Sequence, residues 1–161
     1  MGSDSAHTGS AEEWDLHHRE EVGLSIRAAR TGHLRPTFYI ATSFSNGKRV
    51  QQLAGFLMSR GLRWVYGHNW TQISVNRRDD PRAPMLAQQD LQGAISADLF
   101  VLLPVTPLTA GCHVELGARV AAGKEAHLIR DGATEWHLFH SLPGVIEHDS
   151  VDDFVLFVFG A

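Results

Sequence analysis

The fold of this chain is read most directly from residues 99–124, LFVLLPVTPLTAGCHVELGARVAAGK. The first five residues of this stretch are all apolar, which is typical of a strand buried on both faces of a parallel sheet. Prolines and Gly111 then break the chain. From Cys112 onward apolar residues recur at roughly helical spacing, and Gly123 stands where a helix stop is expected. The stretch therefore predicts a buried strand followed by a helix at the strand's carboxyl end.

The rest of the chain repeats this alternation of strand and helix. Strands are predicted over residues 38–41, 62–66, 99–103, 126–129 and 145–146, and helices over 48–60, 85–97, from Cys112 to the stop at Gly123, and from Ser150 onward. Such an alternation favours a doubly wound parallel sheet. We therefore expect an α/β fold of the flavodoxin-like or Rossmann-like kind, a five-stranded parallel sheet in a three-layer αβα arrangement.

The chain length of 161 residues suits one domain with a substantial core. Residues 1–34 are expected to be an N-terminal extension, Gly/Ser-rich at first and with the apolar spacing of a possible helix over residues 11–30. Residues 35–161 form the predicted domain. Within it, the connection over residues 67–84 is long and charged, and connections beyond ~12 to 15 residues are usually functional or disordered.

Charge and composition narrow the range of partners. A formal net charge of −4 gives no electrostatic footprint for nucleic acid or for an anionic membrane surface. The longest apolar stretches fall far short of the ~20 residues that a membrane-spanning helix requires. The single cysteine, Cys112, excludes an internal disulfide, and the first residues lack the apolar core of a signal peptide. We expect a cytoplasmic protein that binds neither nucleic acid nor membranes.

Glu115 is the candidate catalytic group. The predicted elements place it in the first turn of a helix that follows the central strand. Open α/β sheets bind ligands outside the carboxyl ends of their strands, so this position faces the expected crevice. The helix dipole favours the ionised form of an acid in a first turn, which would leave a carboxylate able to act as nucleophile or base. The alternative interpretation is an ordinary helix-start acid, which the dipole alone would favour.

Two further features could belong to the same site. Residues 42–49, TSFSNGKR, form a strand-to-helix turn whose hydroxyls, glycine and cations suit an anion at a helix N-terminus. The turn is no Walker sequence, and Ser-Asn-Gly before a helix is also ordinary capping chemistry. Asp90 falls on the helix before the buried strand and can point towards the crevice, whereas Asp98 is expected to cap or pair at the opposite edge. A solvated charge is the alternative for each aspartate.

Three segments carry a family resemblance: FYIA at 38–41, DLQGAISAD at 90–98 and GCHVELG at 111–117, the last with a Gly-Lys pair six residues later. Over roughly residues 37–158 the chain resembles the nucleoside 2-deoxyribosyltransferase family. The resemblance implies a five-stranded flavodoxin-like sheet, a homodimer or larger oligomer, and cleavage of the N-glycosidic bond of 2'-deoxynucleosides. It also implies that Glu115 is the nucleophile, that Tyr39 orients it, and that Asp90 contacts the base or assists its protonation.

The resemblance extends less closely to substrate binding. Related deoxynucleoside 5'-monophosphate N-hydrolases hold the 5'-phosphate in a Gly- and Arg-containing loop after the first strand. Here that place is taken by Ser43, Ser45, Asn46, Gly47 and Lys48, with Asn46 and Lys48 standing where arginine would be expected. Nucleoside and nucleotide substrates therefore both stay open. A further candidate is Trp70, an aromatic loop residue that could stack on a base. Gly111 and His113, at the start of the Glu115 helix, are candidates as well.

The function that the resemblance implies is transfer of a deoxyribosyl group from one base to another through a covalent intermediate on Glu115. One alternative is hydrolysis of deoxynucleoside 5'-monophosphates, and another is NAD cleavage by the same chemistry. A different class of function is a nucleotide-binding sensor module without turnover. The ten histidines show no metal-ligand spacing, so no metal site is predicted, and neither transfer nor hydrolysis requires a metal or organic cofactor.

Overall fold

A computed structural model describes residues 35–67, 79–104, 109–133 and 136–160 of the chain. The predicted extension over residues 1–34 and the candidate Trp70 lie outside the described residues. The helices and strands, in chain order, are β1 (Thr37–Ala41), η1 (Phe44–Asn46), α2 (Gly47–Ser59), β2 (Arg63–Trp64), α4 (Ala83–Ser96), β3 (Leu99–Leu102), α5 (Ala110–Ala121), β4 (Ala126–Ile129), η2 (Leu138–Ser141), β5 (Val145–His148) and α6 (Val151–Phe159).

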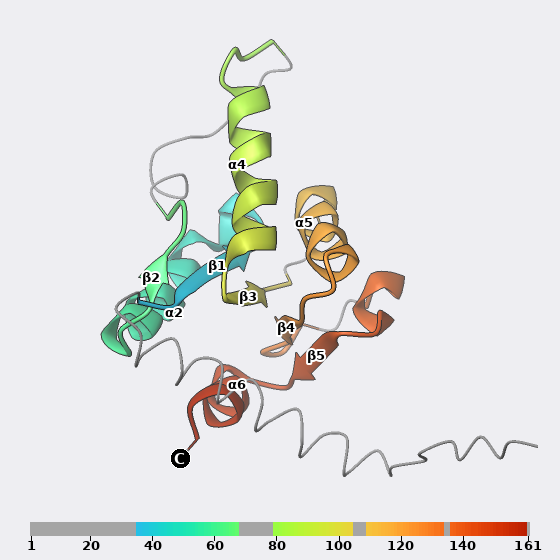
Figure 1. The fold of residues 1–161 in the computed structure, drawn as a ribbon. Coiled ribbons are helices and arrows are strands. Elements are labelled where there is room, and N and C mark those ends of the chain that lie inside the picture. Colours follow the sequence, from blue (N-terminus) through green and yellow to red (C-terminus); the bar gives the residue numbers. More distant parts are fainter. Residues whose placement is uncertain (1–34, 68–78, 105–108, 134–135, 161) are drawn as a thin grey trace, which may run out of the picture.

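The strands form one five-stranded parallel sheet in the order β2-β1-β3-β4-β5. Figure 1 shows α4 and α5 on one face of this sheet and α2 and α6 on the other. This confirms the predicted fold class, a doubly wound α/β fold with three layers. The strand order reverses between β1 and β3, and in open α/β sheets that reversal point is where ligands bind.

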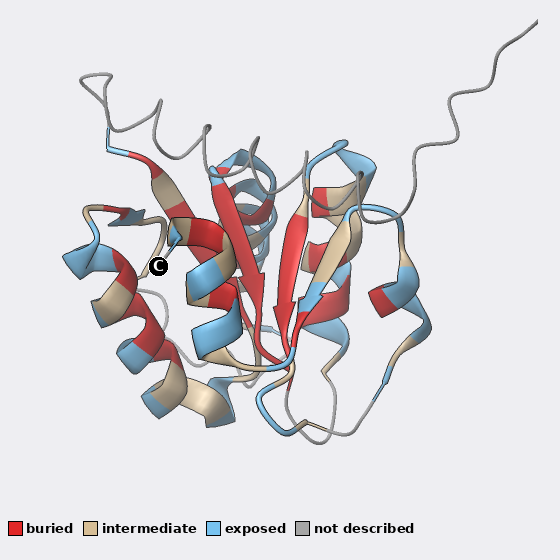
Figure 2. Ribbon diagram, turned by 90° about the horizontal axis from the view of Figure 1, so that it is seen from below, coloured by how far each residue is buried: buried red, intermediate tan, exposed pale blue. Residues whose placement is uncertain are grey.

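The sheet core explains why the central segments are so apolar. The strands β3 and β4 are buried along their whole length, because helices cover both of their faces. Figure 2 shows the same distribution, with buried residues in the central strands and exposed ones on the outer surfaces of the helices. Along β1 the faces alternate, as they must in a strand. Phe38 and Ile40 pack into the cluster with α2 and α6, and Tyr39 packs into the cluster with α4 and α5.

Asp98 joins the amino ends of two neighbouring strands. Its Oδ2 accepts hydrogen bonds from the backbone N–H of Thr37 at 2.7 Å and from the hydroxyl of Thr37 at 2.8 Å. Thr37 begins β1, and Asp98 immediately precedes β3. Asp98 is therefore a structural residue at the edge of the sheet opposite to the strands' carboxyl ends, as the sequence predicted.

Several boundaries differ from the sequence prediction, β5 for example extending to His148 instead of ending at Ile146, and two of the differences lie near the candidate residues. The second strand is confined to Arg63–Trp64 instead of residues 62–66, because Tyr66 takes a positive φ of 54° and so leaves the strand conformation. The helix that carries Glu115 begins at Ala110, after an extended Thr109, instead of near Cys112. The prediction that Glu115 lies in the first turn of its helix is therefore wrong, and the first turn of α5 contains no acidic residue.

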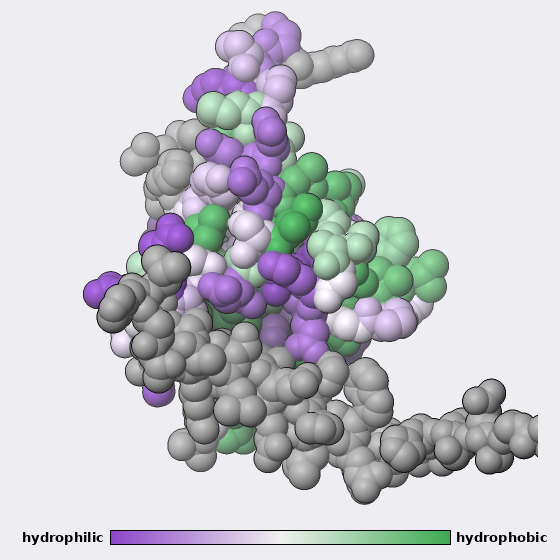
Figure 3. Space-filling view, in the orientation of Figure 1, coloured by the Kyte–Doolittle hydropathy of each residue, from purple (hydrophilic) through white to green (hydrophobic). Residues whose placement is uncertain are grey.

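Apolar side chains are exposed over α5 and η2. Figure 3 shows hydrophobic surface in that region, whereas the surface over α4 is mixed, with exposed Met85, Leu91 and Ile95 among polar residues. The exposed large apolar residues there are Val114, Trp136, Leu138 and Phe139. The predicted assembly into a homodimer or larger oligomer stays a prediction. None of the helices in the described part of the chain is long and apolar enough to cross a membrane.

Candidate active site

A hydrogen bond between Tyr39 and Glu115 is the centre of the candidate site. The hydroxyl of Tyr39 donates to Oε1 of Glu115 at 3.0 Å, which joins β1 to α5. Tyr39 is only 3% exposed, and its ring stacks against Phe100, its partner in register on β3, with the ring centroids 6.1 Å apart. The ring is thus fixed by the sheet, and its hydroxyl holds the carboxylate of Glu115 in one place.

Asp90 of α4 is the third member of the site. Its charge acts on both other groups, because it raises the pKa of Glu115 and that of Tyr39. For Tyr39 the larger cause is burial, followed by the charge of Glu115 and then that of Asp90, and together they raise the pKa of its hydroxyl well above the usual range. The structure therefore brings together all three residues that the sequence proposed as catalytic, each from a different element.

The environment of Glu115 favours its protonated form. Burial and, next, the charge of Asp90 raise the pKa of Glu115 to about 8, although the hydrogen bond from Tyr39 acts in the opposite direction. The expectation that the helix dipole would favour the ionised form is therefore wrong. The dipole acts mainly within the first turn of a helix, and Glu115 lies beyond that turn in a desolvated position. Strongly perturbed carboxyl pKa values are common at catalytic sites.

Gly93 is a site residue that the sequence analysis did not single out. A Cβ at this position would lie 2.6 Å from Cδ2 and 2.7 Å from Cε2 of Tyr39, and 3.1 Å from Cδ2 of Tyr66. Gly93 follows Asp90 by three residues on α4, so the two positions share one face of the helix. Only glycine lets α4 approach the Tyr39 ring this closely. A glycine inside a predicted helix was the available signal, since such a glycine often has a packing reason.

Tyr66 was also missed as a neighbour of the site. The sequence pattern placed it only at the end of the predicted strand over residues 62–66. Its positive φ of 54° turns the chain out of β2 and places its ring beside Gly93. A tyrosine in this backbone conformation is uncommon, and no local sequence signal separates it from a strand residue.

The turn after β1 is shaped by local hydrogen bonds. The hydroxyl of Ser43 accepts from the backbone N–H and the hydroxyl of Ser45, and the amide of Asn46 donates to the hydroxyl of Thr42 at 3.2 Å. Gly47 begins α2, and Lys48 beside it is exposed. The turn lies at the carboxyl edge of the sheet, as does the start of α5. Its role in holding a phosphate stays a prediction.

His113 contacts η2 instead of the Tyr39–Glu115 pair. Its Nδ1 lies 3.0 Å from the carbonyl oxygen of Thr109, and its Nε2 lies 3.2 Å from Nε2 of His140. The ring of His137 lies against it, with the centroids 4.1 Å apart. Positions two residues apart on a helix do not face each other, so His113 and Glu115 point in different directions. Gly111 is exposed in the first turn of α5.

Cys112 and the histidines have structural surroundings. Cys112 of α5 is 4% exposed in the core, and burial raises the pKa of its thiol, so it is a packing residue. The buried histidines form two contacting pairs, His113 with His140 and His127 with His148. Within the described ranges, no group of three or more His, Cys, Asp or Glu residues could hold a metal ion.

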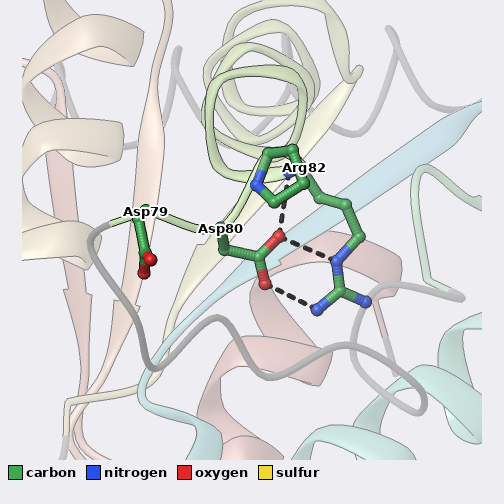
Figure 4. Close-up of a pocket in the computed structure, with 4 residues that line it drawn as sticks. Asp79, Asp80 and Arg82 are labelled. Carbon is green, nitrogen blue, oxygen red and sulfur yellow. Dashed lines mark hydrogen bonds and ion pairs between the residues drawn. The ribbon is translucent and has the colours of Figure 1, made fainter.

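A surface pocket at the start of α4 contains none of the candidate residues. It is lined by Asp79, Asp80, Pro81 and Arg82. Figure 4 shows the guanidinium of Arg82 turned back onto Asp80, to which its Nη2 donates at 2.7 Å. The hydrogen bonds from Arg82 lower the pKa of Asp80 to about 2. Asp80 and Arg82 therefore satisfy each other, and the pocket offers no catalytic grouping.

Comparison with known proteins adds a likeness in fold. No protein-family model matches the sequence, and no curated protein matches it either. A solved structure of a CMP N-glycosidase from Clostridium botulinum, BcmB, is similar with a TM-score of 0.52 and 19% sequence identity, over 74% of this chain and 95% of the other. At this identity the likeness shows the fold alone. The fold of this chain and its likeness to that structure define a three-layer α/β protein with a doubly wound parallel sheet.

Gly93→Ala is expected to destabilise the protein by about 1 to 3 kcal/mol, because the added methyl group overlaps the Tyr39 ring. The matched control is Gly55→Ala on α2, where an added Cβ would meet nothing within 4 Å. That substitution is expected to stabilise by about 0.5 to 1 kcal/mol, since alanine is the better helix former. Urea unfolding measures both, and equal effects of the two substitutions would contradict the close packing of α4 on Tyr39.

Glu115→Gln is expected to stabilise the protein increasingly as the pH rises from 4.5 to 8. Between the ordinary pKa of 4.5 and the folded-state pKa of about 8, the folded protein keeps a proton that the unfolded chain loses. The wild type therefore loses up to about 1.4 kcal/mol per pH unit in this window, whereas the variant does not. The difference in unfolding free energy should grow by on the order of 5 kcal/mol across this window and then level off.

The matched control for this titration is Glu147→Gln, because Glu147 forms a partly exposed ion pair with Arg130 on the surface. The effect of this substitution on the unfolding free energy, measured in urea at the same pH values, should depend on pH less than that of Glu115→Gln. If the difference in unfolding free energy between Glu115→Gln and the wild type is the same at every pH in this range, Glu115 is not held in its protonated form.

Proposed function

We propose that this protein cleaves the N-glycosidic bond of a nucleoside or nucleotide, with Glu115 as the nucleophile. The observation that carries the proposal is the part-buried hydrogen bond from Tyr39 to Glu115, with the charge of Asp90 acting on both groups. A carboxylate that is positioned by a neighbouring hydroxyl and accompanied by a second acid is the arrangement that glycosidic bond cleavage requires. The fold likeness to a CMP N-glycosidase supports the same class of reaction.

The proposed mechanism has two steps. In the first, Glu115 passes its proton to Asp90 or to water, and an oxygen of the ionised Glu115 attacks the anomeric carbon. The bond to the base nitrogen breaks, and the base departs with the proton that Asp90 or water returns. The sugar carries positive charge in the transition state, which the carboxylate stabilises. In the second step an acceptor attacks the same carbon and releases Glu115 as a carboxylate. Tyr39 keeps Glu115 in position throughout, because its hydroxyl is hydrogen-bonded to the oxygen that does not react.

The raised pKa of Glu115 is compatible with its role as a nucleophile. A pKa of about 8 means that the free enzyme holds Glu115 largely protonated at neutral pH. The carboxylate form is more reactive for having lost its solvation, and developing positive charge on the sugar favours the ionised form. The same desolvation that opposes ionisation in the free protein therefore strengthens the interaction in the transition state.

The acceptor in the second step decides between two activities. Attack by a second base gives deoxyribosyl transfer, which the sequence resemblance favours. Attack by water gives hydrolysis, and a 5'-monophosphate substrate is favoured by the fold likeness to a protein that acts on CMP. We place base exchange on deoxynucleosides first and hydrolysis of nucleoside 5'-monophosphates second, with the small-molecule substrate bound at the carboxyl edge between α4 and α5.

Release of free base tests the proposal. Wild type, Glu115→Gln and the control Glu147→Gln are incubated with deoxynucleosides, deoxynucleoside monophosphates and CMP, each with and without a second labelled base, and the products are separated by chromatography. We expect base release by wild type and Glu147→Gln, and a rate at least ~10³-fold lower for Glu115→Gln, because the nucleophile is lost.

Label in a new nucleoside identifies the transferase, and base release that is independent of the second base identifies the hydrolase. Equal rates for wild type and Glu115→Gln would contradict the nucleophilic role of Glu115. Substrate binding without base release by any protein would identify a sensor module, and release of nicotinamide from NAD alone would identify an NAD-cleaving enzyme.

A further inference from the structure

Arg119 is a buried cation that the proposed mechanism does not use. It lies on α5 and is only 4% exposed. Its Nη1 donates to the carbonyl oxygens of Ala97 at 2.5 Å and of Ala94 at 3.2 Å, and its Nη2 donates to that of Asp98 at 3.2 Å. Its Nε donates to the carbonyl oxygen of Glu125 at 2.7 Å. Four backbone carbonyls therefore surround one guanidinium.

Three of these carbonyls belong to the carboxyl end of α4 and the residues that follow it. The last carbonyls of a helix have no partner within the helix, and together they form the negative end of its dipole. Arg119 satisfies them from the neighbouring helix. Its fourth contact, with Glu125, ties the same side chain to the segment before β4. The guanidinium thus attaches the end of α4 to α5 and to the sheet.

The spacing of residues connects this attachment to the candidate site. Arg119 follows Glu115 by four residues on α5, and Ala94 follows Asp90 by four residues on α4. Residues four apart on a helix lie above one another on the same face. The contact between Arg119 and Ala94 is therefore one helical turn away from Glu115 and Asp90. A change in the spacing of α4 and α5 at Arg119 would therefore change the distance between the carboxyl groups of Asp90 and Glu115.

We propose that Arg119 is a positioning residue that holds α4 against α5 and so keeps Asp90 beside the Tyr39–Glu115 pair. The expected effect on catalysis rests on the proposed function, whereas the expected effect on the position of Asp90 does not. A simple helix cap would not require a buried charge, whose desolvation is costly. Burial lowers the pKa of Arg119 to about 10, and the charges of Asp98 and Glu125 act in the opposite direction.

Arginine is suited to this role for a geometric reason. Its rigid, planar fork reaches carbonyls on α4, after α4 and before β4 at once, whereas a lysine ammonium is a single point with three donors. Arg119→Lys therefore keeps the charge and loses the fixed spacing. If α4 moves away from α5, the influence of Asp90 on Glu115 weakens and water enters. Both changes lower the pKa of Glu115 towards its ordinary value.

The test is a carboxyl-carbon NMR titration of Glu115 in wild type, Arg119→Lys and the control Arg63→Lys, which alters an exposed arginine on β2. Three charged or titratable groups interact electrostatically with Glu115: Tyr39 of β1, Asp90 of α4 and Cys112 of α5. None of them is changed. We expect the pKa of Glu115 to fall by about one unit or more in Arg119→Lys and to stay at the wild-type value in Arg63→Lys.

Two further readouts separate positioning from general stability. In an Asp90→Asn background, Arg119→Lys should shift the pKa of Glu115 less, because only the entry of water remains and the part of the effect that acts through the charge of Asp90 is absent. In the base-release assay, kcat should fall by about 10- to 100-fold with little change in KM, since a misplacement of about 1 Å has effects of this size. Guanidinium ions should partly restore kcat in Arg119→Ala.

An unchanged pKa of Glu115 in a folded Arg119→Lys protein would overturn the proposal. The proposal would also fail if Arg119→Lys shifted the pKa of Glu115 equally with Asp90 and with Asn at position 90. If Arg119→Lys does not fold, Arg119→Gln takes its place, because glutamine keeps two N–H donors. The NMR titration needs no substrate. A shifted pKa in a protein that releases no base would therefore support the positioning role and contradict the proposed function separately.

Discussion

Desolvation of one carboxyl group is the constraint on which the candidate site depends. Glu115 of α5 is largely shielded from water where α5 meets α4 and β1, and its one described hydrogen bond to another element comes from Tyr39. Tyr39 can hold this position because its ring is packed on Phe100 in the adjacent strand. The position of the carboxylate is therefore fixed by the sheet, not by a loop. A rigid scaffold of this kind lets a carboxylate be placed in advance of substrate binding, which is a general requirement of electrostatic catalysis.

The interface between α4 and α5 carries the second part of the site. Gly93 lets α4 approach Tyr39, and Arg119 attaches the end of α4 to α5 through backbone carbonyls. Asp90 lies on the same helix, three residues before Gly93 and four before Ala94. Its charge raises the pKa of Glu115, so the stability of the folded protein is reduced at the pH where the carboxyl must ionise. Such a loss of stability is common where a site requires groups in unfavourable protonation states.

Much of the fold was predictable, because apolar patterning reports burial directly. The uniformly apolar run over residues 99–103 identified a strand covered on both faces, and β3 is buried throughout. Tyr39, Asp90 and Glu115 were predicted together from the resemblance, and the structure brings them together. The pKa of Glu115 was not predictable, since it depends on burial and on Asp90, 25 residues earlier in the chain. Gly93 and Tyr66 were missed for the same reason, because their importance arises from contacts between elements and not from local pattern.

Mass spectrometry of a trapped intermediate tests the central claim, that Glu115 becomes covalently bonded to the sugar. A 2'-fluoro-2'-deoxy analogue of the substrate slows the second step, because the fluorine destabilises the positive charge on the sugar. The account predicts that the mass of the wild-type protein increases by one sugar group, on the peptide that contains Glu115, and that Glu115→Gln gains no mass. An adduct on another residue, or base release from this analogue with no adduct at any time, would contradict the account.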